Sequence, residues 1–252
     1  MSLNDHNEQF LIGLSNPDRE EVARSILDLI DIGTFDLDLA TWLASRASIG
    51  ESWITGSGPG GIGKTTTMRT MMSFVPADRK LHLALPDEVP NVPDSPVHCV
   101  MSNELSDHRP PTYLWDQDVR DFCALKEKGH QLVGNVHADN LEETHAQFVG
   151  ECKVPEAQFR AINILVFIQL EGGNPEGEHR IKDAVTKRVV NKIYYSDGSS
   201  DHVPIFDPAT GLLDNTPHDV TAEAKCRSFL ETALASPDRT LEAVRKAFLA
   251  IK

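Results

Sequence analysis

The stretch "GSGPGGIGKTTTMRT" spans residues 56–70 and contains two overlapping glycine patterns. Residues 58–65 fit G-x-x-x-x-G-K-[ST] at every fixed position. Residues 52–55 are a strand candidate that leads into this loop, and residues 64–74 have the composition of a helix. In that order, glycines let consecutive backbone N–H groups turn inward around a phosphate, and the following helix adds the positive end of its dipole. The stretch therefore predicts a phosphate-binding loop.

The same loop predicts which groups hold a nucleotide. The amine of Lys64 is expected to reach the β- and γ-phosphates and the hydroxyl of Thr65 to bind Mg²⁺, so ATP and Mg²⁺ are the expected cofactors. The residues expected to contact the nucleotide are Gly58, Pro59, Gly60, Gly61, Ile62, Gly63, Lys64, Thr65 and Thr66. The alternative is a glycine-rich turn in which the lysine has no such role.

The second pattern, Gly56-x-Gly58-x-x-Gly61, is typical of loops that bind dinucleotides. It leaves Lys64 and Thr65 without a role. In addition, no acidic residue ends a strand about 20 residues later, where such loops place the group that binds the ribose. We therefore interpret this shorter pattern as incidental to the phosphate-binding loop.

Two more candidates follow apolar strands. Glu104 comes just after "VHCVM", where a carboxylate would orient and deprotonate an attacking water and join the Mg²⁺ shell. His137 comes just after "LVGNV" and is expected to contact the γ-phosphate. Asn103 stands where many P-loop enzymes have an aspartate for the metal. One alternative is that Glu104 is a solvated loop acid and that Asp107 provides the carboxylate instead. Another is that His137 is a surface or helix-capping residue.

Strand and helix candidates alternate along the chain, which predicts an α/β fold with a mostly parallel sheet flanked by helices. Further strands are expected at residues 81–85, 97–101, 132–136 and 162–170, and an edge hairpin from residues 185–195. Helices are expected at residues 18–30, 37–46, 116–128, 141–149, 222–235 and 241–251. The proline-rich residues 86–96 predict a long exposed loop without regular structure.

We divide the chain into three parts: a short helical segment at residues 1–49, a P-loop ATPase domain at 50–207 and a C-terminal helical appendage at 208–252. The four cysteines have no metal-ligand spacing and predict reduced thiols. No run of 18 apolar residues and no signal peptide is present, which predicts a cytoplasmic protein without direct membrane insertion. The net charge of -14 argues against broad attraction to nucleic acid.

These motifs, taken together, resemble the ATPase family of type II and type IV secretion, type IV pili and archaeal flagella. "GSGPGGIGKTTTMRTM" is similar to the family's Walker A, "TGPTGSGKTTTLYAL", and "CVMSNELSD" to its Walker B, "VMVGEIRD", which supports Glu104. "KGHQLVGNVHADN" is similar to the histidine box, with both histidines, His130 and His137, at the same separation. The resemblance covers roughly residues 50 to 207, with Asp87 and Glu88 only loosely matching the acidic box.

The resemblance implies a RecA-like ATPase that acts as a homo-oligomer, a hexamer where the family pattern holds. It also implies membrane-platform, pilus or secretion proteins as partners, which would keep the protein at the membrane surface. Arginines from a neighbouring subunit would then neutralise charge in the transition state. The candidates, which the sequence does not rank, are Arg109, Arg120, Arg160, Arg180 and Arg188.

The sequence departs from the family in ways that keep other functions open. Ser106 replaces the Walker B arginine, and only about 50 residues precede the first strand of the loop, where the family has a folded domain. A regulatory switch that binds ATP with little hydrolysis is therefore one alternative. A small-molecule kinase is another, although no arginine-rich lid is present, and a DNA translocase would depend on the basic residues Lys182, Lys187, Arg188 and Lys192.

Overall fold

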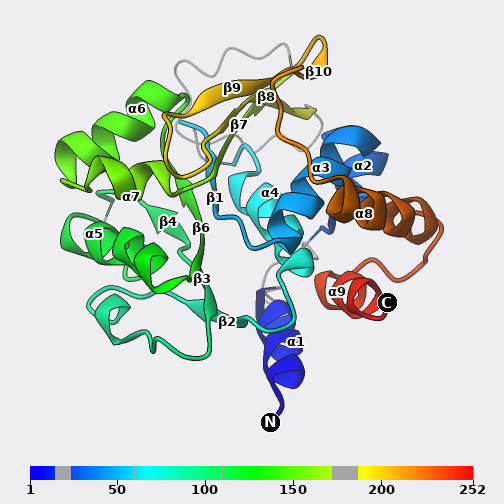
Figure 1. The fold of residues 1–252 in the computed structure, drawn as a ribbon, viewed down its shortest axis with the longest axis horizontal. Coiled ribbons are helices and arrows are strands. Elements are labelled where there is room, and N and C mark those ends of the chain that lie inside the picture. Colours follow the sequence, from blue (N-terminus) through cyan, green and yellow to red (C-terminus); the bar gives the residue numbers. More distant parts are fainter. Residues whose placement is uncertain (15–23, 59–60, 109, 172–186, 252) are drawn as a thin grey trace.

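The computed structural model describes residues 1–14, 24–58, 61–108, 110–171 and 187–251. Its centre is a ten-stranded mixed sheet with helices on both faces (Figure 1). The strands are β1 (Trp53–Gly56), β2 (Lys80–Leu83), β3 (His98–Met101), β4 (Glu104–Leu105), β5 (Tyr113–Leu114), β6 (Gln131–Val136), β7 (Ile164–Leu170), β8 (Arg188–Tyr195), β9 (Val203–Asp207) and β10 (Gly211–Leu212). The expected α/β class, with a central sheet flanked by helices, is confirmed.

The strands run in the order β10-β9-β8-β7-β1-β6-β3-β2. The pairs from β2 to β7 are parallel, and β8, β9 and β10 extend the sheet antiparallel at one edge, where the hairpin was expected. β4 pairs with the end of β6 through Leu105 and Val136. Because parallel strands end at one edge, the residues that follow β1, β3 and β6 meet there.

The α-helices are α1 (Leu3–Leu14), α2 (Ile26–Asp31), α3 (Leu37–Ser48), α4 (Lys64–Thr70), α5 (Gln117–Ala124), α6 (Leu141–His145), α7 (Glu156–Arg160), α8 (Val220–Ala233) and α9 (Leu241–Leu249). Short 3-10 turns occur at Met71–Phe74, Val89–Asn91 and Leu125–Lys128, and a π-helical turn at Ala146–Glu151. Within the described residues, no helix is long and apolar enough to cross a membrane.

Apolar side chains of the central strands serve two cores, one on each face of the sheet. On β1, Trp53 points into the core with α1, α3, α4, α8 and α9, and Ile54 into the core with α5, α6 and α7. β7 alternates in the same way between Val166 and Leu165. Successive side chains of a strand point to opposite faces, so a continuous apolar strand needs cover on both. Figure 1 shows the two groups of helices on either side of the sheet.

Helix α1 was not expected from the sequence, because its two buried residues do not make an apolar stripe. Asn7 is buried and its side chain donates to Arg79 O at 2.8 Å and accepts from Leu81 N at 2.9 Å. These bonds satisfy backbone groups beside and within β2, the last strand of the sheet. A covered edge strand does not offer unpaired groups to another chain.

The structure corrects several expected boundaries. The helix expected at residues 64–74 ends at Thr70, whose hydroxyl donates to Thr67 O at 2.8 Å, and continues as the 3-10 turn. The proline-rich segment is not a wholly exposed loop, because Val89 and Val92 are buried and Val89 begins a 3-10 turn. Of the helix expected at residues 18–30, residues 18–23 lie outside the described residues, and α2 begins only at Ile26.

Candidate functional site

The loop after β1 meets the ends of β4 and β6 at one edge of the sheet. In β1, Gly56 is in register with Val136 at the end of β6. This pairing brings the residues just beyond it, Ser57 and His137, to neighbouring positions. Glu104 reaches the same place because β4 pairs with the end of β6. The fold therefore collects three side chains that the sequence singled out: Lys64, Glu104 and His137.

Lys64 is the first residue of α4, and its side chain turns inward. Only 6% of Lys64 is exposed. Its amine donates to Ser57 O at 3.0 Å and lies 3.6 Å from Glu104 Oε1. Burial lowers the pKa of Lys64, and the Glu104 carboxylate opposes that shift. An anion that contacts this amine from the loop side would stabilise its charged form in the same way.

Glu104 is the buried acid of the site. Its Oε1 has no hydrogen-bond partner among the described residues, although Lys64 and His137 lie near it. Burial raises the pKa of Glu104, while the positive charges of Lys64 and of a protonated His137 act in the opposite direction. A carboxylate with a buried oxygen that lacks a hydrogen-bond partner and with a raised pKa is a stronger proton acceptor than a solvent-exposed one.

His137 connects the loop to this pair. Its Nδ1 lies 3.1 Å from Lys64 Nζ and 3.0 Å from Gly58 O, and its Nε2 lies 3.7 Å from Glu104 Oε1. When the Lys64 ammonium donates to Nδ1, the ring proton is on Nε2 and faces the carboxylate. When the proton is on Nδ1, this nitrogen donates to Gly58 O. The Lys64 amine could then only accept a hydrogen bond from Nδ1, which requires the neutral amine. The charge of Lys64 is thus coupled to the His137 tautomer.

Thr65 and Asn135 form the polar group beside these residues. Asn135 Nδ2 donates to Thr65 Oγ1 at 3.2 Å and to Asn103 O at 2.9 Å. Asn135 Oδ1 is buried and has no hydrogen-bond partner in the part of the chain that is described. Together with Glu104, the site offers hydroxyl, amide and carboxylate oxygens, which are the ligands that Mg²⁺ prefers. The residues present therefore fit a magnesium ion that also binds phosphate oxygens and water.

No group of three or more histidine, cysteine, aspartate or glutamate side chains in the described residues could hold a metal ion. This is compatible with Mg²⁺, which keeps several waters and is commonly bound through one or two protein groups together with the phosphates of a substrate. A structural zinc ion would need a closed set of protein ligands instead. The donor set thus favours a metal that arrives with a phosphate ligand.

The described part of the glycine loop is held closely by its surroundings. Gly63, which precedes α4, has φ +103°, a conformation that side chains rarely adopt. The backbone N–H of Gly58 donates to Asp139 Oδ1 at 2.5 Å, and a side chain at Gly58 would collide with that carboxylate. Ile62 is 1% exposed and anchors the loop in the core.

The other residues that the sequence predicts to contact the nucleotide are Pro59, Gly60, Gly61 and Thr66. Pro59 and Gly60 lie outside the described residues. Gly61 is exposed with φ +85°, and Thr66 is half-buried in the first turn of α4. Their roles in binding a nucleotide stay predictions.

Arg188 lies next to the loop of its own chain. It begins β8, and its Nη2 donates to Gly61 O at 3.5 Å. Its Cγ lies 3.8 Å from the position that a Cβ on Gly63 would take. The sequence suggested Arg188 as a group supplied to a neighbouring subunit. In the structure its guanidinium is on the loop of the same subunit.

The other arginine candidates form ion pairs with residues outside the loop or lie outside the described residues. Arg120 forms an ion pair with Asp116 at 2.7 Å, and Arg160 with Asp201 at 2.7 Å. Arg109 and Arg180 are outside the described residues. The structure thus brings only Arg188, of the described candidates, to the loop.

The remaining sequence candidates have partners other than Lys64. His130 precedes β6 and its Nδ1 accepts from His98 N at 2.9 Å, so it lies at the other end of the strand from His137. Asp107 is exposed and pairs with His108 at 3.3 Å. Asp87, of the loose acidic box, donates its backbone N–H to Asp118 on α5 at 2.9 Å.

Sequence reasoning missed the residues that position the site. Asn135 interrupts the apolar run of β6, and an amide inside a buried strand was the signal that could have identified it. Gln147 Nε2 donates to His137 O at 2.7 Å and holds the turn after β6. Asp139, which accepts the hydrogen bond from the Gly58 N–H, follows His137 by two residues and belongs to no sequence motif that would have indicated this role.

No protein-family model matches the chain, and no curated protein sequence matches it. Among solved structures, the VirB11 ATPase of the Brucella suis type IV secretion system, crystallised in complex with sulphate, is similar with a TM-score of 0.41 and 19% sequence identity. The similarity covers 76% of this chain and 58% of that one. This chain thus spans little more than half the length of that structure, and similarity at this level carries no information on function.

Proposed function

We propose that this chain binds Mg-ATP on residues 58–66 and hydrolyses it. The observation that supports this most strongly is the convergence of Lys64, Glu104 and His137 behind a glycine loop. The positive charge of Lys64 stands at the end of the loop, and a buried carboxylate with a raised pKa lies beside it. An anionic substrate that reacts with water needs both features.

Each side chain has a distinct role in this proposal. Lys64 exchanges its bond with Ser57 O for the β- and γ-phosphates, and the backbone N–H groups of residues 61–65 surround the β-phosphate. Glu104 accepts the proton of the water that attacks the γ-phosphorus, as the bond to the ADP oxygen breaks. His137 contacts the γ-phosphate by donating the proton of the ring nitrogen that faces it.

Thr65 and Glu104 are the residues that would hold Mg²⁺, with Asn135 positioning the Thr65 hydroxyl. When bound, the ion supplies positive charge that neutralises phosphate oxygens. Arg188 lies on the loop side of this arrangement and supplies a further positive charge. We assign these functions to a P-loop, RecA-like domain at residues 50–207, with residues 1–49 and 208–252 as flanking helical parts.

The physiological role that we propose is that of an assembly or motor ATPase of the secretion and pilus type. This step rests on the three sequence boxes rather than on the geometry. It implies a homo-oligomer, membrane-platform or pilus proteins as partners, and a position at the cytoplasmic face of a membrane. A steady-state ATPase assay in the presence of a vesicle-embedded platform protein would test it.

The hydrolysis proposal is tested by phosphate release and ATP binding measured on the same preparations. Lys64→Ala is expected to lose both, whereas Glu104→Gln is expected to keep binding and lose turnover, by about 100-fold or more. Glu142→Gln, a change at an exposed acid on α6, serves as the control and should match the wild type. Equal turnover in Glu104→Gln and the wild type would contradict the role of Glu104.

A regulatory switch with little hydrolysis is the second candidate. It is favoured by Asn103, which contributes its backbone carbonyl to Asn135 and offers no carboxylate for the metal. Under this alternative, wild-type protein would retain ATP at a one-to-one ratio and release almost no phosphate. Rapid turnover in the wild type would exclude it.

A further inference from the structure

His108 is an exposed residue beside the candidate site, and the proposed ATPase gives it no role. The centroid of its ring lies 5.3 Å from that of the His137 ring, and the two ring planes are tilted by 45°. This separation is within the range in which aromatic rings pack against each other. His108 therefore gives the His137 ring a contact of a kind that neither Lys64 nor Glu104 provides.

Ser106 holds His108 through both its ring and its backbone. The Ser106 Oγ lies 2.7 Å from Nδ1 of His108 and accepts from the His108 backbone N–H at 3.3 Å. Asp107 Oδ1 also lies near this Nδ1, at 3.3 Å. Ser106 is 3% exposed, and its own N–H donates to Leu114 O, in β5, at 3.0 Å. A buried residue that is paired with a strand thus anchors the exposed His108 ring.

The ring of His137 serves the loop and the carboxylate together only in one orientation. Its Nδ1 lies beside Lys64 Nζ and Gly58 O, and its Nε2 faces Glu104. A half-turn about χ2 would place ring carbons at these polar groups instead. Because χ2 of histidine has broad, roughly two-fold preferences, the side chain does not select this orientation by itself. Neighbouring groups must therefore fix the ring.

We propose that His108 is a positioning residue for His137 and that Ser106 anchors it. The contact between the two rings restricts rotation of the His137 imidazole, which keeps Nδ1 toward the loop and Nε2 toward Glu104. The effect of His108 on turnover rests on the proposed contact of His137 with the γ-phosphate, whereas the ring orientation is a property of the protein without nucleotide. His108 itself touches no reacting atom.

The ring orientation is tested by NMR of the full chain without nucleotide, from the side-chain ¹⁵N signals of the histidines at one pH. The His137 signals are assigned by their loss in His137→Ala. His108→Ala is expected to shift them toward the averaged values of a ring that exchanges between orientations. His108→Phe keeps a ring at this position and should retain the wild-type signals. Ser106→Ala removes the anchor and should change them in the same direction as His108→Ala.

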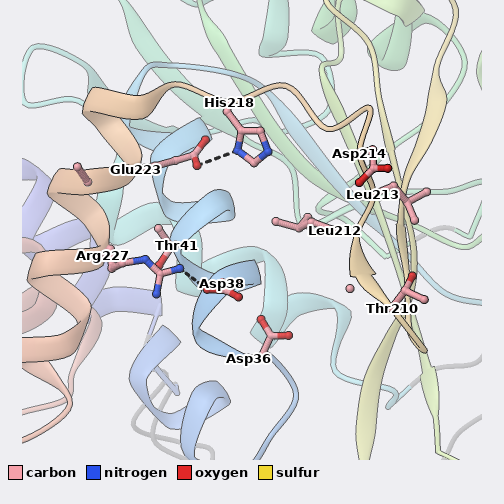
Figure 2. A pocket seen from close by; sticks show the side chains of 12 residues that line it. Asp36, Asp38, Thr41, Thr210, Leu212, Leu213, Asp214, His218, Glu223 and Arg227 are labelled. Carbon is pink, nitrogen blue, oxygen red and sulfur yellow. Dashed lines mark hydrogen bonds and ion pairs between the residues drawn. The ribbon is translucent and has the colours of Figure 1, made fainter.

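His218→Ala is the matched control. Like His108, His218 is exposed, and its Nδ1 lies 2.9 Å from a carboxylate oxygen of Glu223. Figure 2 shows this pair at a cavity between α3, β10 and α8, whose lining includes none of the described residues of the candidate site. His218→Ala should leave the His137 signals and ATP turnover unchanged. Thermal unfolding of each variant checks that it is folded.

Steady-state ATPase assays give the second readout. His108→Ala is expected to lower kcat by about two- to tenfold, which corresponds to the loss of one contact between aromatic rings. The KM for ATP should change by less than about twofold, because Lys64 and the loop keep their contacts with the nucleotide. His108→Phe should restore most of the lost kcat.

The two readouts separate this proposal from the proposed hydrolysis. Unchanged His137 signals in His108→Ala, or the same change in His108→Phe, would overturn the positioning role. Equal kcat in His108→Ala and an active wild type would overturn its contribution to turnover. If the wild type releases no phosphate, the proposed hydrolysis fails, and the NMR comparison still decides whether His108 positions His137.

Discussion

The amine nitrogen of Lys64 lies 3.1 Å from Nδ1 of His137, and the same imidazole nitrogen lies 3.0 Å from Gly58 O. One ring nitrogen therefore serves either the lysine or the loop backbone, according to where the histidine proton is. The other ring nitrogen faces Glu104 at 3.7 Å. This arrangement couples the loop to the buried carboxylate.

The first prediction concerns this coupling. His137→Ala removes the contact to the γ-phosphate and the partner of Lys64, so ATP turnover should fall by about 10- to 100-fold while ATP still binds. Single-turnover kinetics together with equilibrium binding would measure the two effects separately. His145→Ala, a change at a half-buried histidine that pairs with Glu156, is the control and should leave both unchanged.

A second prediction follows from the position of Arg188 on its own loop. Arg188→Ala should weaken ATP binding by about tenfold, the effect of losing one hydrogen bond to a charged group. Lys192→Ala, on the same strand and paired with Asp207, should bind ATP like the wild type. If, in mixed oligomers, Arg188→Ala subunits next to wild-type subunits bound ATP with full affinity, the arginine would act between subunits instead.

Much of the fold could be predicted because its central strands are continuous and apolar. β1, β6 and β7 are buried on both faces, so their sequences carry a clear signal. Helix α1 gave no such signal, since it is held by hydrogen bonds from Asn7 to the backbone beside β2. β4 and β5 have two residues each, too few for any periodic pattern.

The candidate site, like the fold, could be predicted only in part from the sequence. Lys64, Glu104 and His137 stand at the ends of recognisable elements, and the structure brings them together. Asn135 was hidden inside an apolar strand, because its partners, Thr65 and the Asn103 carbonyl, come from distant parts of the sequence. Whether a group acts within or between subunits depends on tertiary placement, which a sequence pattern does not contain.

The third prediction concerns the space at the start of the loop. A Cβ on Gly56 would lie 2.6 Å from the Phe167 ring and 2.8 Å from Ala138 O. Gly56→Ala should therefore lower the free energy of unfolding by about 1–3 kcal/mol, as overpacking of a core does. Gly150→Ala, where nothing lies within 4 Å, is the control and should have little effect. Urea unfolding with equal stability for the two variants would contradict this account.

The fourth prediction is a loss of stability in mild acid. Burial, and then His130 and His82, lower the pKa of His98 from 6.5 to about 4. The folded state thus binds fewer protons than the unfolded state between these values, so the free energy of unfolding decreases as pH falls from 6.5 to about 4.

The slope that His98 contributes is at most about 1.4 kcal/mol per pH unit. Neighbouring His82 and His130, whose pKa values are also lowered by burial, act in the same direction. His98→Val should flatten the dependence measured by urea unfolding at several pH values. An unchanged slope in this variant would assign the acid sensitivity to other groups.

The central claim is that Lys64 holds the phosphates of ATP in the loop after β1. The most direct measurement is the equilibrium dissociation constant of ATP in the presence of Mg²⁺, compared between the wild type, Lys64→Ala and Lys128→Ala. Lys128 is a half-exposed lysine paired with Asp94. We predict that Lys64→Ala weakens binding by about 100-fold or more and that Lys128→Ala binds like the wild type. Equal ATP affinity in all three proteins, each shown to be folded, would contradict the claim.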